Sequence, residues 1–213
     1  MGFAKEGFDC TGIDVVNVGY PYRFILADML SLKGEDFRGY DVIWLSPPCR
    51  HWSSFARIYG STWKNKPDPE GQGMKLVNAS LTFVERAQPK FWIMENTDGL
   101  VKYLGLKPRF VTYLSLGSNN QGKKHGFWGN FPSCLIPKDN RKKPITYHKI
   151  IQGKRYPKSA NAGKLESWIN AKIPLACSQA FARACKDVLL EKGFQSGNYV
   201  AIIKDELKRK RKI

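Results

Sequence analysis

No segment of this sequence comes near the roughly eighteen consecutive apolar residues of a membrane-spanning helix, so we expect no membrane span. The five cysteines, at positions 10, 49, 134, 177 and 185, are odd in number and contain no C-x-x-C pair, which argues against a disulfide framework and a structural zinc site. Cys49 and His51 lie close in sequence, but no second pair of ligands follows, so we expect no metal. The first residues lack the basic and apolar regions of a signal peptide, which predicts a cytoplasmic protein.

Acidic residues are also scarce. Asp and Glu together number 18 against 35 Lys and Arg in 213 residues, which gives a net charge of +17. A net positive charge of this size says more about binding partners than about the fold, and it favours binding to nucleic acid or another anionic surface. A solvated basic surface without a partner is the alternative interpretation.

Two short apolar runs end in reactive side chains. Residues 42–45 (Val-Ile-Trp-Leu) lead into the sequence Ser-Pro-Pro-Cys that ends at Cys49, and residues 91–94 (Phe-Trp-Ile-Met) lead directly into Glu95. Each run is typical of a buried strand. Ligands of parallel α/β sheets bind at the carboxyl ends of the strands. We therefore predict that Cys49 and Glu95 supply a nucleophile and a proton donor at one site.

Helical and strand patterns alternate along the rest of the chain, and the last two strand patterns are joined by a turn signal at residues 119–122. This alternation predicts an α/β fold with an antiparallel hairpin at its edge. The expected strands are residues 10–14, 24–27, 41–45, 91–94, 110–116 and 126–131, and the expected helices are residues 2–7, 74–87, 99–104 and 175–190.

A strongly basic segment interrupts this pattern. Residues 138–164 carry nine Lys or Arg against one acid, with aromatic residues between them, which is typical of a phosphate-contacting insert; a disordered basic linker is the alternative. We expect residues 1–137 to form a catalytic core, 165–192 to return to it as a helix, and 193–213 to end in a basic tail. The candidate phosphate-contacting residues are Arg141, Lys142, Lys143, Lys154 and Arg155.

These features resemble the cytosine-C5 DNA methyltransferases. The Pro-Cys at residues 48–49 and the Glu-Asn at residues 95–96 are similar to the family's P-C and E-N-V motifs, with Thr97 in place of the valine. Four further stretches resemble family motifs in the same order: residues 12–14 (Gly-Ile-Asp), 27–28 (Ala-Asp), 121–125 (Gln-x-Lys-x-His) and 170–174 (Asn-Ala-x-x-Pro).

The resemblance implies a Rossmann-like, S-adenosylmethionine-dependent fold with a mostly parallel sheet, and methylation of double-stranded DNA as in restriction-modification systems. It implies that Cys49 attacks C6 of a flipped-out cytosine, that Glu95 protonates N3 and that Asn96 braces the loop. We expect Arg50 and His51 to favour the thiolate. Lys123 and His125 fall where the family has arginines. The residues expected to bind the cofactor are Asp14, Asp28, Pro47 and Asn170.

Two departures from the family leave alternatives open. The family's first motif, a central strand followed by a Gly-rich loop, has no counterpart in this sequence. A preceding segment, a second polypeptide or residues 199–203 could fill that place. His125 also stands where the family has an arginine, without the arginine's bidentate fork. The alternatives are therefore an inactive or split DNA-binding remnant, a tRNA methyltransferase, or an amino-methyltransferase acting on cytosine N4 or adenine N6.

Overall fold

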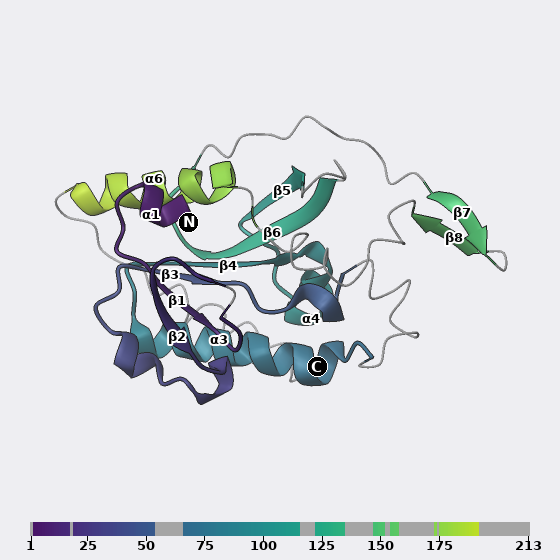
Figure 1. The fold of residues 1–213 in the computed structure, drawn as a ribbon, viewed down its shortest axis with the longest axis horizontal. Helices are drawn as coiled ribbons and strands as arrows, with labels where there is room; N and C mark the ends of the chain where they lie inside the picture. Colours follow the sequence, from purple (N-terminus) through teal and green to yellow (C-terminus); the bar gives the residue numbers. More distant parts are fainter. Residues whose placement is uncertain are drawn as a thin grey trace.

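The computed structural model describes residues 2–17, 19–53, 66–115, 122–134, 147–151, 154–157, 173 and 175–191, and its strands form three sheets (Figure 1). Two of the strand pairs in this part of the chain are parallel, β1 with β2 and β3 with β4, and the other three are antiparallel. The fold is thus mixed α/β. The sheets are β1 (Thr11–Asp14) with β2 (Arg23–Leu26); β3 (Val42–Leu45), β4 (Phe91–Thr97), β6 (Gly122–Asn130) and β5 (Phe110–Ser115), in that order; and β7 (Tyr147–Ile151) with β8 (Lys154–Pro157).

Helices cover both faces of the four-stranded sheet (Figure 1). Helix α3 (Met74–Ala87) lies on one face, and α1 (Gly2–Lys5) and α6 (Leu175–Leu190) lie on the other. The shorter elements are α4 (Val101–Leu104), the 3₁₀ turns η1 (Met29–Ser31), η2 (Gly34–Phe37), η3 (Cys49–His51) and η6 (Asp98–Leu100), and the π-helical turn η5 (Pro69–Gly73).

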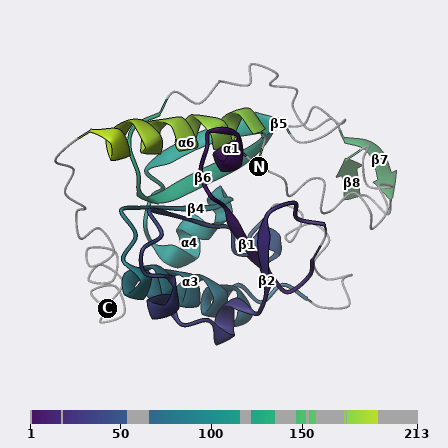
Figure 2. The same ribbon diagram turned by 60° about the vertical axis from the view of Figure 1, so that its left-hand side comes forward.

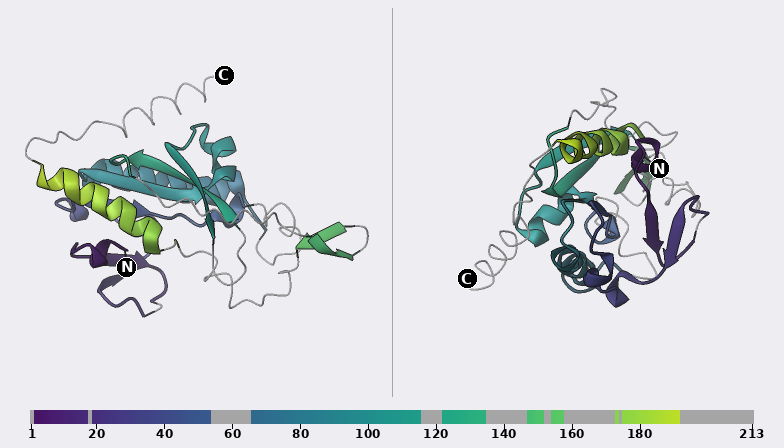
Figure 3. Two further views of the ribbon diagram at one scale, coloured as in Figure 1. Left: turned by 90° about the horizontal axis from the view of Figure 1, so that it is seen from above. Right: turned by 90° about the vertical axis from the view of Figure 1, so that its left-hand side faces the viewer.

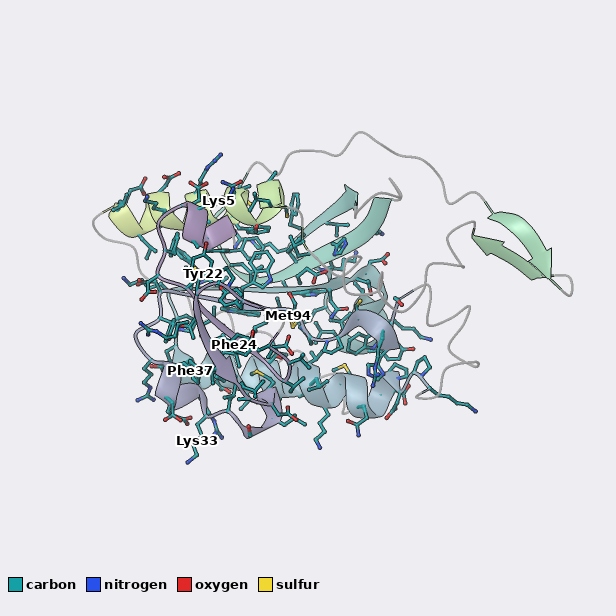
Figure 4. The ribbon with its side chains drawn as sticks, viewed as in Figure 1. Lys5, Tyr22, Phe24, Lys33, Phe37 and Met94 are labelled. Atoms are coloured by element: carbon teal, nitrogen blue, oxygen red, sulfur yellow. The ribbon has the colours of Figure 1, made fainter. Side chains whose placement is uncertain are left out.

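Strand β4 is the centre of the core, since all seven of its residues are buried. Its side chains alternate between the two faces, as a pleated strand requires. Trp92 and Met94 join the cluster on the α3 side, whereas Phe91 and Ile93 join the cluster that contains Phe181 of α6. Figure 4 shows Met94 in the interior of the molecule.

The main helices have the predicted bounds. Apolar residues recur with helical spacing along α3, which buries Val77, Leu81 and Val84 against the sheet. The helix ends at Gln88, which has φ of 52° and donates its N–H to the Val84 carbonyl. The prediction for residues 175–190 is likewise confirmed by α6.

Two strands are longer than predicted. The strand expected at residues 91–94 continues to Thr97, because Glu95, Asn96 and Thr97 pair with β6. Strand β6 begins at Gly122 rather than near residue 126, because residues 122–125 pair with the end of β5. The predicted antiparallel hairpin is confirmed, although its turn at residues 116–121 lies outside the described residues.

Helices α1 and α6 lie side by side and run in the same direction (Figures 2 and 3). A Cβ atom on Gly2 would lie 2.1 Å from Ser178 Oγ, so the helices touch there. Four residues later, Glu6 Oε1 accepts a hydrogen bond from Gln179 (2.8 Å), and the Glu6 carbonyl accepts one from Lys186 Nζ (3.0 Å). Because α1 leads into the start of β1, the end of α6 lies at the amino ends of the parallel strands.

The hairpin β7–β8 falls inside the basic segment, where the sequence predicted no element, and it lies apart from the other sheets (Figures 1 and 3). Among the described residues, no helix is long and apolar enough to cross a membrane.

Candidate active site

The Pro-Cys loop leaves the carboxyl end of β3 and turns at once into η3. The Trp44 indole donates a hydrogen bond to Ser46 Oγ (2.9 Å), Pro47 is buried, and Cys49 begins the 3₁₀ turn half-buried. The Cys49 carbonyl accepts hydrogen bonds from the backbone N–H groups of Trp52 (3.1 Å) and Ser53 (2.9 Å). The backbone around the thiol is therefore held by its own turn.

Asn96 ties this loop to the neighbouring strand. Its Nδ2 donates to the Pro47 carbonyl (2.8 Å), and its Oδ1 accepts from the Thr97 N–H (2.9 Å); the side chain is fully buried. The expected bracing role of Asn96 is confirmed. Since Leu45 of β3 lies opposite Met94 of β4 in a parallel pair, Glu95 and the loop that carries Cys49 both lie towards the carboxyl end of this strand pair.

Glu95 is buried in contact with His125 of β6, whose Nδ1 hydrogen-bonds Glu95 Oε1. The other imidazole nitrogen, His125 Nε2, and the Thr97 hydroxyl are buried and have no hydrogen-bond partner within the described part of the chain. Buried polar atoms of this kind normally have partners, so these two are candidates for ligand contacts. Nothing in the sequence singled out the Thr97 hydroxyl. Lys123 lies in β6 opposite Leu114 of β5.

His51 anchors the far end of the Pro-Cys loop, a role that the sequence did not reveal. Its Nδ1 accepts the backbone N–H of Asp68 (2.9 Å), and Asp68 caps η5 by accepting N–H groups at both carboxylate oxygens. Burial, and then the nearby Arg50 guanidinium, lower the pKa of His51. The lowered pKa leaves the His51 imidazole mostly uncharged at neutral pH, and its effect on the Cys49 thiolate stays a prediction. Arg50 remains as the neighbouring cation.

Asp14 and Asp28 stand at the carboxyl ends of the paired strands β1 and β2. The two strand ends are joined by a hydrogen bond from the Ala27 N–H to the Asp14 carbonyl (3.1 Å). Asp28 Oδ1 accepts the Leu30 N–H (2.9 Å), and Asp14 Oδ1 accepts the Val16 N–H (3.3 Å), so local turns hold both carboxylates.

A cavity of about 440 Å³ brings together Asp14, Asp28 and Pro47, three of the four residues expected to bind the cofactor. Its lining combines these carboxylates with apolar side chains such as Val15 and Met29. This set suits the hydroxyl and amino groups of a nucleoside and the faces of its base. No lysine or arginine is among the described lining residues, so they offer no cation for the carboxylate of the methionine part.

The remaining predicted site residues lie outside the described residues or in a strand described only by its backbone. Asn170 and residues 141–143 belong to the first group, and Lys154 and Arg155 of β8 to the second. In the described part of the chain, no group of three or more His, Cys, Asp or Glu residues is placed to hold a metal ion.

Comparisons with known proteins agree with this geometry. Residues 15–105, which include Cys49 and Glu95, match the family model for C-5 cytosine-specific DNA methylase. Over 143 residues the chain is 30% identical to the "Probable DNA (cytosine-5)-methyltransferase" of Frog virus 3 (isolate Goorha), and the match covers 63% of this chain. The match spans 65% of that relative, slightly less than two thirds of its length. Residues 15–105 of the chain are thus similar to the C-5 cytosine-specific DNA methylases.

Proposed function

We propose that the chain transfers a methyl group from S-adenosylmethionine to C5 of cytosine in double-stranded DNA. The observation that carries this proposal is that Glu95 and the loop with Cys49 lie at the carboxyl ends of two paired parallel strands, where Asn96 is hydrogen-bonded to the Pro47 carbonyl. A thiol and a carboxyl group so placed can act on opposite parts of one pyrimidine ring.

Cys49 acts as the nucleophile. Its thiolate, favoured by the Arg50 charge, forms a bond to C6 while Glu95 donates a proton to N3, and this makes C5 nucleophilic. The cofactor supplies an electrophilic methyl group. Once C5 carries that group, the C5 proton passes to solvent water and the N3 proton returns to Glu95, while the C6–S bond breaks to release the Cys49 thiolate and restore the aromatic ring.

His125 orients the proton donor. Its Nδ1 contact with Glu95 holds the carboxyl group in a buried position on β4. Its Nε2, buried and without a protein partner in the described part of the chain, is the atom we assign to the cytosine carbonyl. A single N–H can donate there, although it lacks the bidentate geometry of arginine.

The cofactor and the DNA are held by separate groups. Asp14 and Asp28 would bind the ribose hydroxyls and the adenine amino group, and Pro47 would form part of the wall, a role supported by their common cavity. Asn170 is assigned by the family resemblance alone. The basic segment would contact DNA phosphates, offsetting the cost of flipping the base, and its residues include Arg141, Lys142, Lys143, Lys154 and Arg155.

Methylated nucleosides provide the test. Duplex DNA treated with the protein and methyl-labelled cofactor should yield 5-methylcytosine after digestion, and Cys49→Ala should lower the yield by about 10⁴-fold or more. Cys134→Ala is the matched control, because burial raises the pKa of that thiol to about 11 and leaves it unreactive. Formation of N4-methylcytosine or N6-methyladenine would show that the protein is an amino-methyltransferase, and full activity of Cys49→Ala would contradict the role of Cys49 as the nucleophile.

A further inference from the structure

His51 lies in η3, two residues after the assigned nucleophile Cys49, and its ring is confined by its surroundings. The His51 side chain is 4% exposed and packs against the Trp52 ring, with 5.8 Å between the ring centroids. A Cβ atom on Gly73 of η5 would lie 3.1 Å from His51 Cβ, so η5 also touches this residue. The packing therefore fixes where the two ring nitrogens lie.

The Asp68 backbone decides which ring nitrogen carries a hydrogen. The Asp68 N–H donates to His51 Nδ1 (2.9 Å), so Nδ1 must offer its lone pair. A neutral imidazole has one lone-pair nitrogen and one N–H nitrogen, and the lowered pKa of His51 favours the neutral ring. The hydrogen is therefore on Nε2, which becomes a donor.

Arg50 brings a second donor to the same place. Arg50 Nε lies 3.3 Å from His51 Nε2, and its N–H is aimed at that nitrogen. Since arginine has no acceptor and the His51 lone pair is already used, two N–H groups face each other and neither satisfies the other. Within the described residues no acceptor contacts His51 Nε2. An oxygen that accepts from both groups would replace this unfavourable contact by two hydrogen bonds.

The charge of the pair selects an anionic oxygen. Arg50 is exposed, and in the described part of the chain it forms no ion pair with a carboxylate. The Asp68 carboxylate is occupied by the N–H groups of Gly71 (2.9 Å) and Gln72 (2.8 Å). The terminal nitrogens of the Arg50 guanidinium keep a planar fork of donors, the geometry that suits a phosphate group.

We propose that Arg50 and His51 together bind a backbone phosphate of DNA beside the cytosine that Cys49 attacks. This inference rests on the proposed function. Cys49 and Arg50 are consecutive, with their Cα atoms about 3.8 Å apart, so an anion held by Arg50 lies next to a base held at Cys49. A nucleotide inside a strand has a phosphate on each side. A contact to one of them holds the strand in register while the base is flipped out.

The carboxylate of S-adenosylmethionine is the other anion that the reaction brings. The described lining of the cofactor cavity includes Pro47 and Pro48 but neither Arg50 nor His51. The pair therefore lies beyond that lining, on the side of the loop that continues past Cys49, and this favours the DNA phosphate.

Nuclear magnetic resonance of the full chain, without DNA or cofactor, tests the site. Long-range nitrogen–proton correlations at neutral pH should show that His51 carries its hydrogen on Nε2. Inorganic phosphate should shift the Arg50 Nε–H and His51 Nε2–H signals together and to saturation, and short duplex DNA should shift the same two signals. Arg38 is the matched control, because its exposed guanidinium already donates from Nε to the Arg86 carbonyl (3.3 Å).

Neutral phosphate analogues then test which anion is bound. Arg50→Gln should weaken binding of duplex DNA about tenfold or more, as expected for losing a charged hydrogen bond. Placing one methylphosphonate beside the methylated cytosine should weaken the wild type equally, and Arg50→Gln should then cost nothing further. Lys33→Gln removes an exposed charge at the start of η2 and should show no such coupling to any single phosphate.

The remaining outcomes contradict the proposal. A hydrogen on His51 Nδ1, a charged ring, or phosphate shifts no larger than those at Arg38 would remove the site. Shifts caused by S-adenosylmethionine alone, with none added by DNA, would assign the site to the cofactor carboxylate instead. Methylation of cytosine C5 without coupling of Arg50 to any phosphate would overturn this inference and leave the proposed function standing. Failure of the proposed function is seen separately, as the absence of 5-methylcytosine, and the spectra with phosphate and DNA still decide whether the pair binds them.

Discussion

The two parallel strand pairs of this molecule are built differently. Every residue of β4 is buried, and β3 beside it is held between α3 and the aromatic cluster around Phe181. By contrast, no residue of β1 or β2 is fully buried, and Leu26 at the end of β2 is 68% exposed. The groups assigned to the chemistry therefore stand on a fully buried strand and its neighbours, whereas those assigned to the cofactor stand on a pair of partly exposed strands.

The hydrogen bonds at the two sites differ in the same way. Asn96 and His125 link residues that are 30 or more positions apart and belong to neighbouring strands or loops. In the described part of the chain, the carboxylates of Asp14 and Asp28 accept hydrogen bonds from N–H groups two residues further along. Long-range bonds fix one strand relative to another, but local turns do not. We expect the four-stranded sheet to set the rate of the reaction and the β1–β2 pair to set cofactor affinity.

The largest expected effect follows from removing the proton donor. Glu95→Gln should lower kcat for methyl transfer by about 10²- to 10⁴-fold, since the amide cannot protonate N3. The Kd for S-adenosylmethionine should stay unchanged, because Glu95 lies outside the described cavity lining. Single-turnover kinetics and calorimetry measure the two quantities. If Glu95→Gln weakened cofactor binding as much as it lowered kcat, the assignment of catalysis and cofactor binding to separate regions would be wrong.

A change in the β1–β2 pair should have the opposite signature. Asp14→Asn should raise the Kd for the cofactor about tenfold to a hundredfold, as expected for losing charged hydrogen bonds, with a smaller effect on the saturated rate. Asp9→Asn is the matched control on the same segment, because Asp9 is exposed and forms a long ion pair with Arg23 at 3.5 Å. Unchanged affinity in Asp14→Asn would remove the cofactor assignment.

The link between the Pro-Cys loop and β4 can be weakened directly. Asn96→Ala leaves the Pro47 carbonyl and the Thr97 N–H without their hydrogen-bond partner in a buried site. Each of these two unpaired groups should lower the free energy of unfolding by about 1–3 kcal/mol. Asn130→Ala removes an exposed bond to the Lys90 carbonyl and should cost less than about 1 kcal/mol. Chemical denaturation compares the two, and equal costs would contradict the bracing role.

These contrasts also explain which features the sequence could predict. The bounds of α3 and α6 follow from apolar periodicity, a local signal, and they were predicted to the residue. The extension of β4 to Thr97 depends on pairing with β6, almost 30 residues later in the chain, so the apolar run alone placed its end too early. The hairpin β7–β8 was not predicted, because its sequence has no alternating apolar pattern.

In the candidate site, too, features that depend on local sequence could be predicted and features that depend on long-range contacts could not. Cys49 and Glu95 were predictable because each directly follows an apolar run or belongs to its end. The charge of His51 could not be predicted, because it depends on the burial of the side chain and on the Asp68 N–H seventeen residues away. The contact between Glu95 and His125 likewise depends on strand register, which residue types do not reveal.

The smallest expected effect concerns the buried imidazole of His51. The pKa of His51 is lowered in the folded state from its ordinary value of 6.5, so the unfolded chain binds more protons as the pH falls below that value. The His51 contribution to stability is therefore complete above about pH 6.5 and is lost as the pH falls towards the folded pKa. His51→Gln, which can still accept the Asp68 N–H, should lack this component. Urea unfolding between pH 7.5 and 5.5 should show a steeper loss in the wild type, and parallel curves would contradict the assignment.

A covalent trap tests the central claim, that Cys49 attacks the cytosine ring. Duplex DNA containing 5-fluorocytosine has no C5 hydrogen to lose, so the bond between Cys49 and C6 should persist after methyl transfer. With S-adenosylmethionine present, we predict a denaturation-resistant protein–DNA adduct that maps to the peptide containing Cys49. The adduct should form in the wild type and in Cys134→Ala, and should be absent from Cys49→Ala. No adduct in the wild type, or an adduct that survives in Cys49→Ala, would contradict the account.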